Sequence, residues 1–220
     1  MRLPDSVLFV GAHCDDVELM AGGLLARAAR EGRRVGVLVF SDHRGVLDDA
    51  AAARARRELA ANLAWLREGG ADLEEHEPEL WLPACRGRFE AEREALYAAM
   101  ERLRDRYALV VTHGAHDTNQ DHRQVAEEAA RVFKAHATLL AGEHPHNDLG
   151  TFEPRVYLEL APADLDAKVR MVGAYASQRV GDRPYLEEST LRALARLRGS
   201  QIRAAAAEAF AVGARLLVPA

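Results

Sequence analysis

The stretch that decides the fold is VLFVGAHCDDVE, residues 7–18. Its first four residues are apolar, and the run has the length of one buried strand that ends at a glycine. Apolar residues then recur at helical spacing over 17–30, which predicts a helix. We therefore expect His13, Asp15 and Asp16 on the loop at the carboxyl end of a strand, where open α/β sheets bind their ligands.

This cluster of one imidazole and two carboxylates has two interpretations. Asp is a favoured N-cap residue, so Asp15 or Asp16 could simply cap the following helix. A cap, however, needs one carboxylate and no histidine. We therefore interpret the cluster as a site that binds a metal or transfers protons.

Strands and helices alternate along the rest of the chain. Apolar runs predict further strands at 35–40, 80–82, 108–112 and 155–160. Helical spacing predicts helices at 17–30, 49–67, 90–104, 123–136, 164–176 and, for the most part, 191–217. Such alternation predicts a single α/β domain over residues 1–220, with a mostly parallel, Rossmann-like sheet and helices on both faces.

A second polar cluster, HGAHDTNQDHR at residues 113–123, follows another of the predicted strands. Clusters at the ends of parallel strands in one sheet lie on the same edge, so His122 could reach His13 and Asp16. Two histidines and a carboxylate with one open position are a common ligand set for catalytic zinc. An Asp beside such a ligand, here Asp15, is free to take a proton from water. Taken alone, His122 could equally be a structural histidine near a helix start.

Composition limits the class of protein. The chain has 220 residues, of which 29% are charged, and its net charge is −5. A nucleic-acid-binding protein would need a clustered excess of Lys and Arg, so we expect no nucleic-acid partner. No stretch approaches the ~20 apolar residues of a membrane span, and no cleavable leader is visible, so we expect no membrane partner. Because Cys14 and Cys85 are too few for a disulfide framework, we expect a cytoplasmic protein.

Both polar clusters resemble the motifs of one protein family. Residues 12–19 with Gly22 and Gly23 resemble the A-H-P-D-D-x-E-L…G-G signature of the LmbE-like, or PIG-L, de-N-acetylases. Residues 117–123 resemble the D-T-H-Q-D-H-R motif of the same family. Weaker similarities extend over nearly the whole chain, at 56–58, 152–157, 175–178, 198–201 and 207–210. The resemblance implies zinc-dependent removal of an N-acetyl group from an N-acetylglucosaminyl-type small molecule.

The resemblance also implies a role for each matching residue. His13, Asp16 and His122 would bind one zinc ion per chain, although this ligand set also accepts iron(II) or cobalt. Asp15 would be the general base, and zinc would activate water and stabilise the oxyanion. Asp121 would orient an imidazole.

Two residues depart from the family pattern. Cys14 stands where the family has proline, and we expect it to pack inward rather than to serve as a soft metal ligand. Asn119 stands where the family has a histidine that polarises the oxyanion or acts as an acid. An amide can donate a hydrogen bond to an oxyanion but cannot carry a proton. A nearby histidine could compensate; we favour His116, with His144 and His146 as alternatives.

The expected substrate is a small acetamido-sugar compound. Arg56 would contact its hydroxyls or an anionic group, or would form only a salt bridge within its own helix. One rival function is a metal-dependent amide or ester hydrolase that acts on a non-sugar compound. The other is a catalytically weakened binding protein, marked by Asn119, although the retained Asp15 argues against it. A homo-oligomer is possible.

Overall fold

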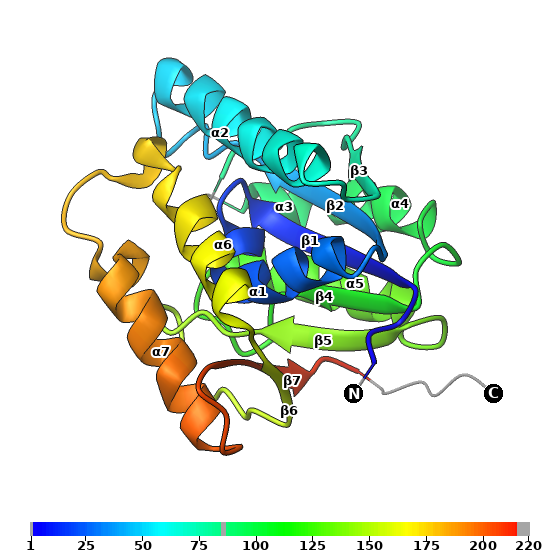
Figure 1. Ribbon diagram of the computed structural model, residues 1–220. Helices are drawn as coiled ribbons and strands as arrows, with labels where there is room; N and C mark the ends of the chain where they lie inside the picture. Colours follow the sequence, from blue (N-terminus) through cyan, green and yellow to red (C-terminus); the bar gives the residue numbers. More distant parts are fainter. Residues whose placement is uncertain (1, 85–86, 215–220) are drawn as a thin grey trace.

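The structure, a computed structural model, describes residues 2–84 and 87–214, which form one seven-stranded sheet covered by helices (Figure 1). The strands follow the order β3-β2-β1-β4-β5-β7-β6. The parallel part comprises β3 (Leu73–His76), β2 (Arg34–Ser41), β1 (Ser6–His13), β4 (Leu109–Thr112) and β5 (Thr138–Gly142). β7 (Ala207–Val212) is antiparallel to both of its neighbours, β5 and β6 (Val156–Glu159). The predicted α/β class with a mostly parallel sheet is confirmed.

Helices cover both faces of this sheet. One face packs against α1 (Asp16–Arg30), α2 (Asp49–Glu68) and α6 (Pro162–Gly173), and the other against α3 (Arg88–Ala91), α4 (Arg93–Glu101) and α5 (Gln120–Phe133). α7 (Glu188–Ser200) packs beside β7, after the short 3₁₀ turns η1 (Ala176–Gln178) and η2 (Pro184–Leu186). Among the described residues, no helix combines the length and the apolar character that a membrane span requires.

The central strand β1 shows why the sheet is covered on both sides. Val7 and Phe9 belong to the core on the side of α1 and α2, while Leu8 and Val10 belong to the core on the side of α4 and α5. All four residues are 0% exposed. Burying each such side chain contributes about 1.5–3 kcal/mol. A continuous apolar run therefore specifies a central strand of a helix-covered parallel sheet.

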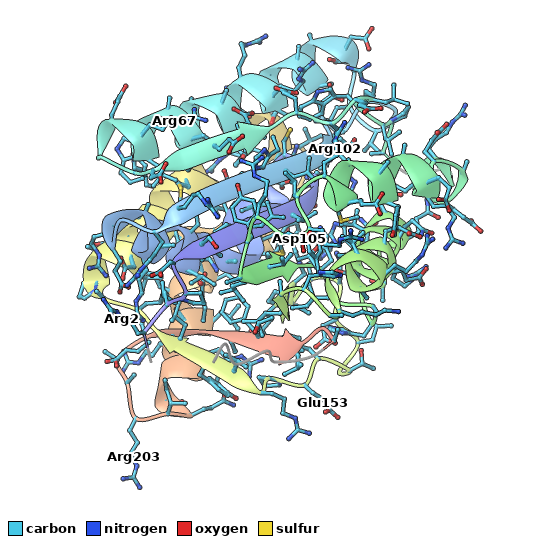
Figure 2. All side chains as sticks on the ribbon, turned by 90° about the vertical axis from the view of Figure 1, so that its right-hand side faces the viewer. Arg2, Arg67, Arg102, Asp105, Glu153 and Arg203 are labelled. Carbon is cyan, nitrogen blue, oxygen red and sulfur yellow. The ribbon has the colours of Figure 1, made fainter. Side chains whose placement is uncertain are left out.

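The direction in which successive strands are added to the sheet reverses between β1 and β4. From β1 the chain winds outward to β2 and β3, and it then returns to the other side of β1 to form β4 and β5. The carboxyl ends of the parallel strands lie on the left in Figure 1, and the crevice left by such a reversal is where α/β sheets bind ligands. The opposite edge, which faces the viewer in Figure 2, carries charged side chains such as Arg67, Arg102 and Asp105.

α1 departs from regular helix at Ala21, whose φ is −148°. Just after this break, the backbone N–H groups of Gly23 and Leu24 donate to the carboxylate of Glu208 in β7, at 2.9 and 2.7 Å. Lys168 in α6 donates to the same carboxylate at 2.7 Å. A Cβ on Gly23 would come within 2.7 Å of a leucine side chain, so glycine lets the helix approach the sheet closely.

Two predicted elements are wrong. No strand forms at 80–82, because the strand beside β2 is β3, whose sequence LEEH has a weak apolar signal. The helix predicted over 191–217 ends at Ser200, and β7 follows it. β7 is rich in alanine, which favours a helix locally, but pairing with β5 and β6 on either side stabilises a strand. Residues 215–217 lie outside the described residues.

Candidate metal centre and its pocket

The two polar clusters meet where β1 and β4 end. His13 is the last residue of β1, and Asp16 is the first residue of α1. His122 lies in the first turn of α5, which begins close to the end of β1 because β1 and β4 are neighbours. These three residues are only 3–5% exposed, and their ligand atoms lie close enough together to hold one metal ion.

The distances among the three ligand groups, with either oxygen of the Asp16 carboxylate, fit a tetrahedral metal ion. His13 Nδ1 lies 3.2 Å from both Asp16 Oδ2 and His122 Nε2, and His122 Nε2 lies 3.3 Å from Asp16 Oδ1. Zinc binds nitrogen and oxygen at about 2.0–2.2 Å, which places neighbouring ligands of a tetrahedron roughly 3.3–3.6 Å apart. The residues present therefore match a metal site, and His₂Asp ligation suits zinc.

Carboxylates hold the ring nitrogens that face away from this centre. His122 Nδ1 lies 2.8 Å from Asp117 Oδ2, and His13 Nε2 lies 3.1 Å from Asp121 Oδ2. Such carboxylate–histidine contacts fix the ring orientation and raise the basicity of a metal-binding imidazole. The structure places Asp121 beside an imidazole, although its effect on catalysis stays a prediction. Asp117 was missed by the sequence analysis, even though it lies in the second motif.

The protein without metal holds protons in this cluster. Burial alone would lower the pKa of His13, but the Asp16 charge and the bonds to Asp121 and Asp16 outweigh it and raise the pKa to about 10. His122 behaves alike: Asp16 and Asp117 overcome burial and raise its pKa to about 9. A metal ion must displace these protons, so metal affinity falls as the pH falls.

Asp15 does not cap α1 through its side chain. Instead, its Oδ1 lies 2.9 Å from Nε2 of His43, on the loop that follows β2. The capping interpretation is therefore wrong for Asp15. His43 has a φ of +65°, a conformation that is uncommon outside glycine and clusters at functional sites. Its place just after a predicted strand was a signal that the sequence analysis did not use.

A stack of imidazoles forms one wall of the centre. His113 accepts a hydrogen bond from the Ala12 N–H at 2.9 Å and stacks on His122, with ring centroids 3.9 Å apart. His144 stacks on His113 in turn, at 5.1 Å. His113, His122 and His144 with Asp117 could be taken for a second metal site. His113 Nε2 already accepts the Ala12 N–H, and Asp117 already binds His122, so we regard these residues as support for the first site.

The metal centre opens into a pocket of about 190 Å³. His13, Asp15, Asp16 and His122 lie at this pocket, and loops from the rest of the chain complete it. The lining side chains from those loops are mostly polar and include His43, Asn119, His144, His146, Asn147, Gln178, Arg183 and Tyr185. Several of them come from the C-terminal third, for which the sequence analysis predicted no pocket residue.

Three of the predicted site residues do not line this pocket: Asp121 is buried against His13, and Arg56 and His116 lie away from the metal centre. Arg56 on α2 packs over the ring of Trp81, 4.3 Å from its centroid, in a separate and larger groove of about 670 Å³. We regard the smaller pocket as the functional site because the larger groove contains no cluster of metal ligands among the described residues. His116 packs over Gly114 and against Phe152 instead of entering the pocket.

The two departures from the family pattern have different structural roles. Cys14 is 0% exposed and belongs to the hydrophobic core, so it packs inward as expected. Asn119 lines the pocket and is also the N-cap of α5, where its Oδ1 accepts the Asp121 N–H at 2.9 Å. Asn is among the best N-cap residues, and its amide nitrogen can still donate to a substrate. Cys85 lies outside the described residues.

Solved structures with the same fold include proteins of different activity. The conserved protein TT1542 from Thermus thermophilus is 25% identical, with a TM-score of 0.74 and coverage of 97% of this chain and 96% of that one. The N,N'-diacetylchitobiose deacetylase from Pyrococcus horikoshii is 18% identical, with a TM-score of 0.71 and coverage of 95% and 84%. GalB from Pseudomonas putida KT2440, a 4-carboxy-2-hydroxymuconate hydratase, is 19% identical, with a TM-score of 0.69 and coverage of 98% of both chains.

Sequence comparison assigns the family. No curated protein matches the chain. The family profile described as PIG-L, GlcNAc-PI de-N-acetylase, matches residues 8–133, which is more than half of the 220 residues and includes both polar clusters. With matching motifs, matching fold and a His/Asp metal centre where those motifs meet, this chain belongs to the PIG-L (LmbE-like) family of de-N-acetylases.

Proposed function

We propose that the protein is a metal-dependent N-deacetylase that hydrolyses the acetamide group of a small acetamido-sugar compound. The observation that carries this proposal is the presence of Asp15 in one pocket with His13, Asp16 and His122. Family membership supports the deacetylation, and the chitobiose deacetylase with the same fold supports an acetamido sugar as the substrate class.

His13, Asp16 and His122 would hold the metal ion, which we propose to be one zinc per chain. Such an ion lowers the pKa of a bound water towards ~7 and polarises a carbonyl group. Iron(II) and cobalt accept the same ligands, and availability in the cell would then decide between them.

Asp15 would take and return the proton of the reaction. Burial favours its neutral form, but the adjacent His43 outweighs this effect and lowers the pKa of Asp15 below its usual value. The carboxylate is therefore ionised at neutral pH. Its Oδ1 is held by His43, so Oδ2 is the oxygen that would accept a proton from water and deliver it to the leaving amine.

The rest of the pocket would bind and orient the substrate. The amides of Asn147 and Gln178 and the guanidinium of Arg183 line it from two separate loops. Sugar hydroxyls both donate and accept hydrogen bonds, and these amides offer both kinds of partner. The small volume of the pocket suits an acetamido group and one sugar ring better than a polymer.

Acetate release and metal content test the proposal together. We expect the purified chain to contain about one zinc and to release acetate from N-acetylglucosamine compounds. Asp15→Asn should keep the zinc and lose about 10²–10⁴-fold in turnover. Asp105→Asn is the matched control, because Asp105 is exposed at the opposite edge of the molecule.

Activity on acetanilides but on no acetamido sugar would favour a non-sugar amide hydrolase. Hydration of an unsaturated acid without acetate release would favour a hydratase activity for this chain. A metal-loaded chain with neither activity would indicate a binding protein.

A further inference from the structure

His144 is a buried imidazole whose ring nitrogens have no hydrogen-bond partner. It follows β5, and only 7% of its surface is exposed. Neither Nδ1 nor Nε2 makes a hydrogen bond to any residue that the structure describes. More than nine in ten buried polar groups in proteins are hydrogen-bonded, so an exception inside a binding pocket points to a ligand.

The ring is fixed in place and directed at the metal centre. It lines the pocket, and its Nε2 lies 3.7 Å from Asp16 Oδ1. One side of the ring stacks on His113, whose own Nε2 accepts the Ala12 N–H from the neighbouring strand β1. His144 is thus held by packing, and both of its nitrogens lack a hydrogen-bond partner among the described residues.

His144 is poorly placed to be a metal ligand. The ligand groups of the centre approach one another to 3.2–3.3 Å, whereas His144 Nε2 lies 3.7 Å from Asp16 Oδ1. A neutral imidazole carries one N–H, and the Asp16 carboxylate favours the tautomer that has it on Nε2.

The other candidates for this role are less suited to it. His116 packs on Phe152 outside the pocket. Asn119 keeps a donor only in its amide nitrogen, because its side-chain oxygen caps α5. His146 lines the pocket but is exposed, whereas His144 is buried.

We propose that His144 is a catalytic residue that donates a hydrogen bond from Nε2–H to the carbonyl oxygen of the substrate acetamide. The donor would strengthen its bond as negative charge develops on that oxygen, and no proton would be transferred. It would thereby replace the histidine that the family pattern has at position 119. This inference rests on the proposed deacetylase function.

Steady-state kinetics on the zinc-loaded protein test the inference. We expect His144→Ala to lose about 10²–10³-fold in kcat with little change in KM, as for other oxyanion donors. His144→Gln, which keeps an N–H donor, should lose less. Both variants should retain the zinc content of the unmodified chain. His116→Ala and His136→Ala are matched controls, because His116 packs outside the pocket and His136 is exposed beside Asp105; neither should reproduce the fall in kcat.

A rescue experiment excludes a merely structural role. Asn119→His in the His144→Ala background should raise kcat at least tenfold above that of His144→Ala alone, because it restores an imidazole donor to the pocket lining. An unchanged kcat in a His144→Ala variant that keeps its zinc would overturn the inference, and so would loss of zinc from that variant. An unmodified, zinc-loaded chain that releases no acetate from any substrate would instead overturn the proposed function and this inference with it.

Discussion

The metal centre and the Lys168–Glu208 pair are both buried and charged, yet they are organised in opposite ways. Lys168 and Glu208 are 5% and 4% exposed, and Glu208 accepts bonds from Lys168 and from two backbone N–H groups of α1. In the metal centre, the lone pairs of His13, Asp16 and His122 converge on one point. Burial of charge therefore does not mark a functional site; what marks it is a set of electron donors directed at one another.

The largest expected effect comes from removing a convergent ligand. Asp16→Ala should abolish zinc binding and reduce acetate release to background, because two histidines alone cannot complete the site. Elemental analysis after dialysis and an acetate assay measure this. Asp105→Asn, at the opposite edge, is the control. An Asp16→Ala chain that kept one zinc would show that Asp16 is not a required metal ligand.

Breaking the structural pair should instead cost stability. Glu208→Ala leaves the Lys168 charge and two backbone N–H groups without their partner, so the free energy of unfolding should fall by about 3–5 kcal/mol. Urea denaturation measures the change. In the double variant Glu208→Ala with Lys168→Met, part of the loss should return. A loss below about 1 kcal/mol in the single variant would mean that water replaces the carboxylate and that the pair is not truly buried.

Removing a carboxylate that holds a metal-binding histidine should have an intermediate effect on zinc affinity or turnover. Asp117→Asn weakens the contact of 2.8 Å to His122 Nδ1 and should lower zinc affinity or turnover by about 10–100-fold. Competition with a chelator of known affinity measures the first quantity, and Asp105→Asn at the opposite edge of the molecule is the control. Unaltered zinc affinity together with unaltered turnover would contradict the role that we give to Asp117.

Glu18 is a buried carboxyl group that belongs to neither the metal centre nor the Lys168–Glu208 pair, and its effect on stability should depend on pH. Its Oε1 accepts bonds from Tyr175 and Asn62, at 2.8 and 3.1 Å, and burial raises its pKa to about 7. The folded state therefore keeps a proton that the unfolded chain releases above about pH 4.3. The stability of the protein should fall as the pH rises from about 4.3 to 7 and then level off.

Glu18→Gln keeps both hydrogen bonds but cannot ionise. The free energy of unfolding of this variant should exceed that of the unmodified chain by up to about 3 kcal/mol at pH 8 and by almost nothing at pH 4. Melting curves at the two pH values measure the difference. An equal effect at both pH values would show that Glu18 does not titrate on unfolding in this range.

Much of the fold and of the metal centre could be predicted from local sequence pattern. The apolar run at residues 7–10 has no polar position, and only a strand buried on both faces tolerates that. Polar clusters directly after such runs lie at strand ends, and parallel strands place those ends on one edge. That is why His13, Asp16 and His122 could be grouped without a structure.

What local pattern could not decide is which distant segments meet. The alanine-rich segment 207–212 becomes β7 because the sheet offers it two partners, and its Glu208 meets α1 across 185 residues of sequence. For the same reason the pocket contains His43 and His144 but not Arg56. The sequence by itself determined the strands β1, β2, β4 and β6, and the polar chemistry that follows β1 and β4, since these depend on short-range hydrophobic spacing; β3, β5 and β7 were not predicted. Only the tertiary structure decided which loops close over the centre, because that depends on strand order, which no local spacing encodes.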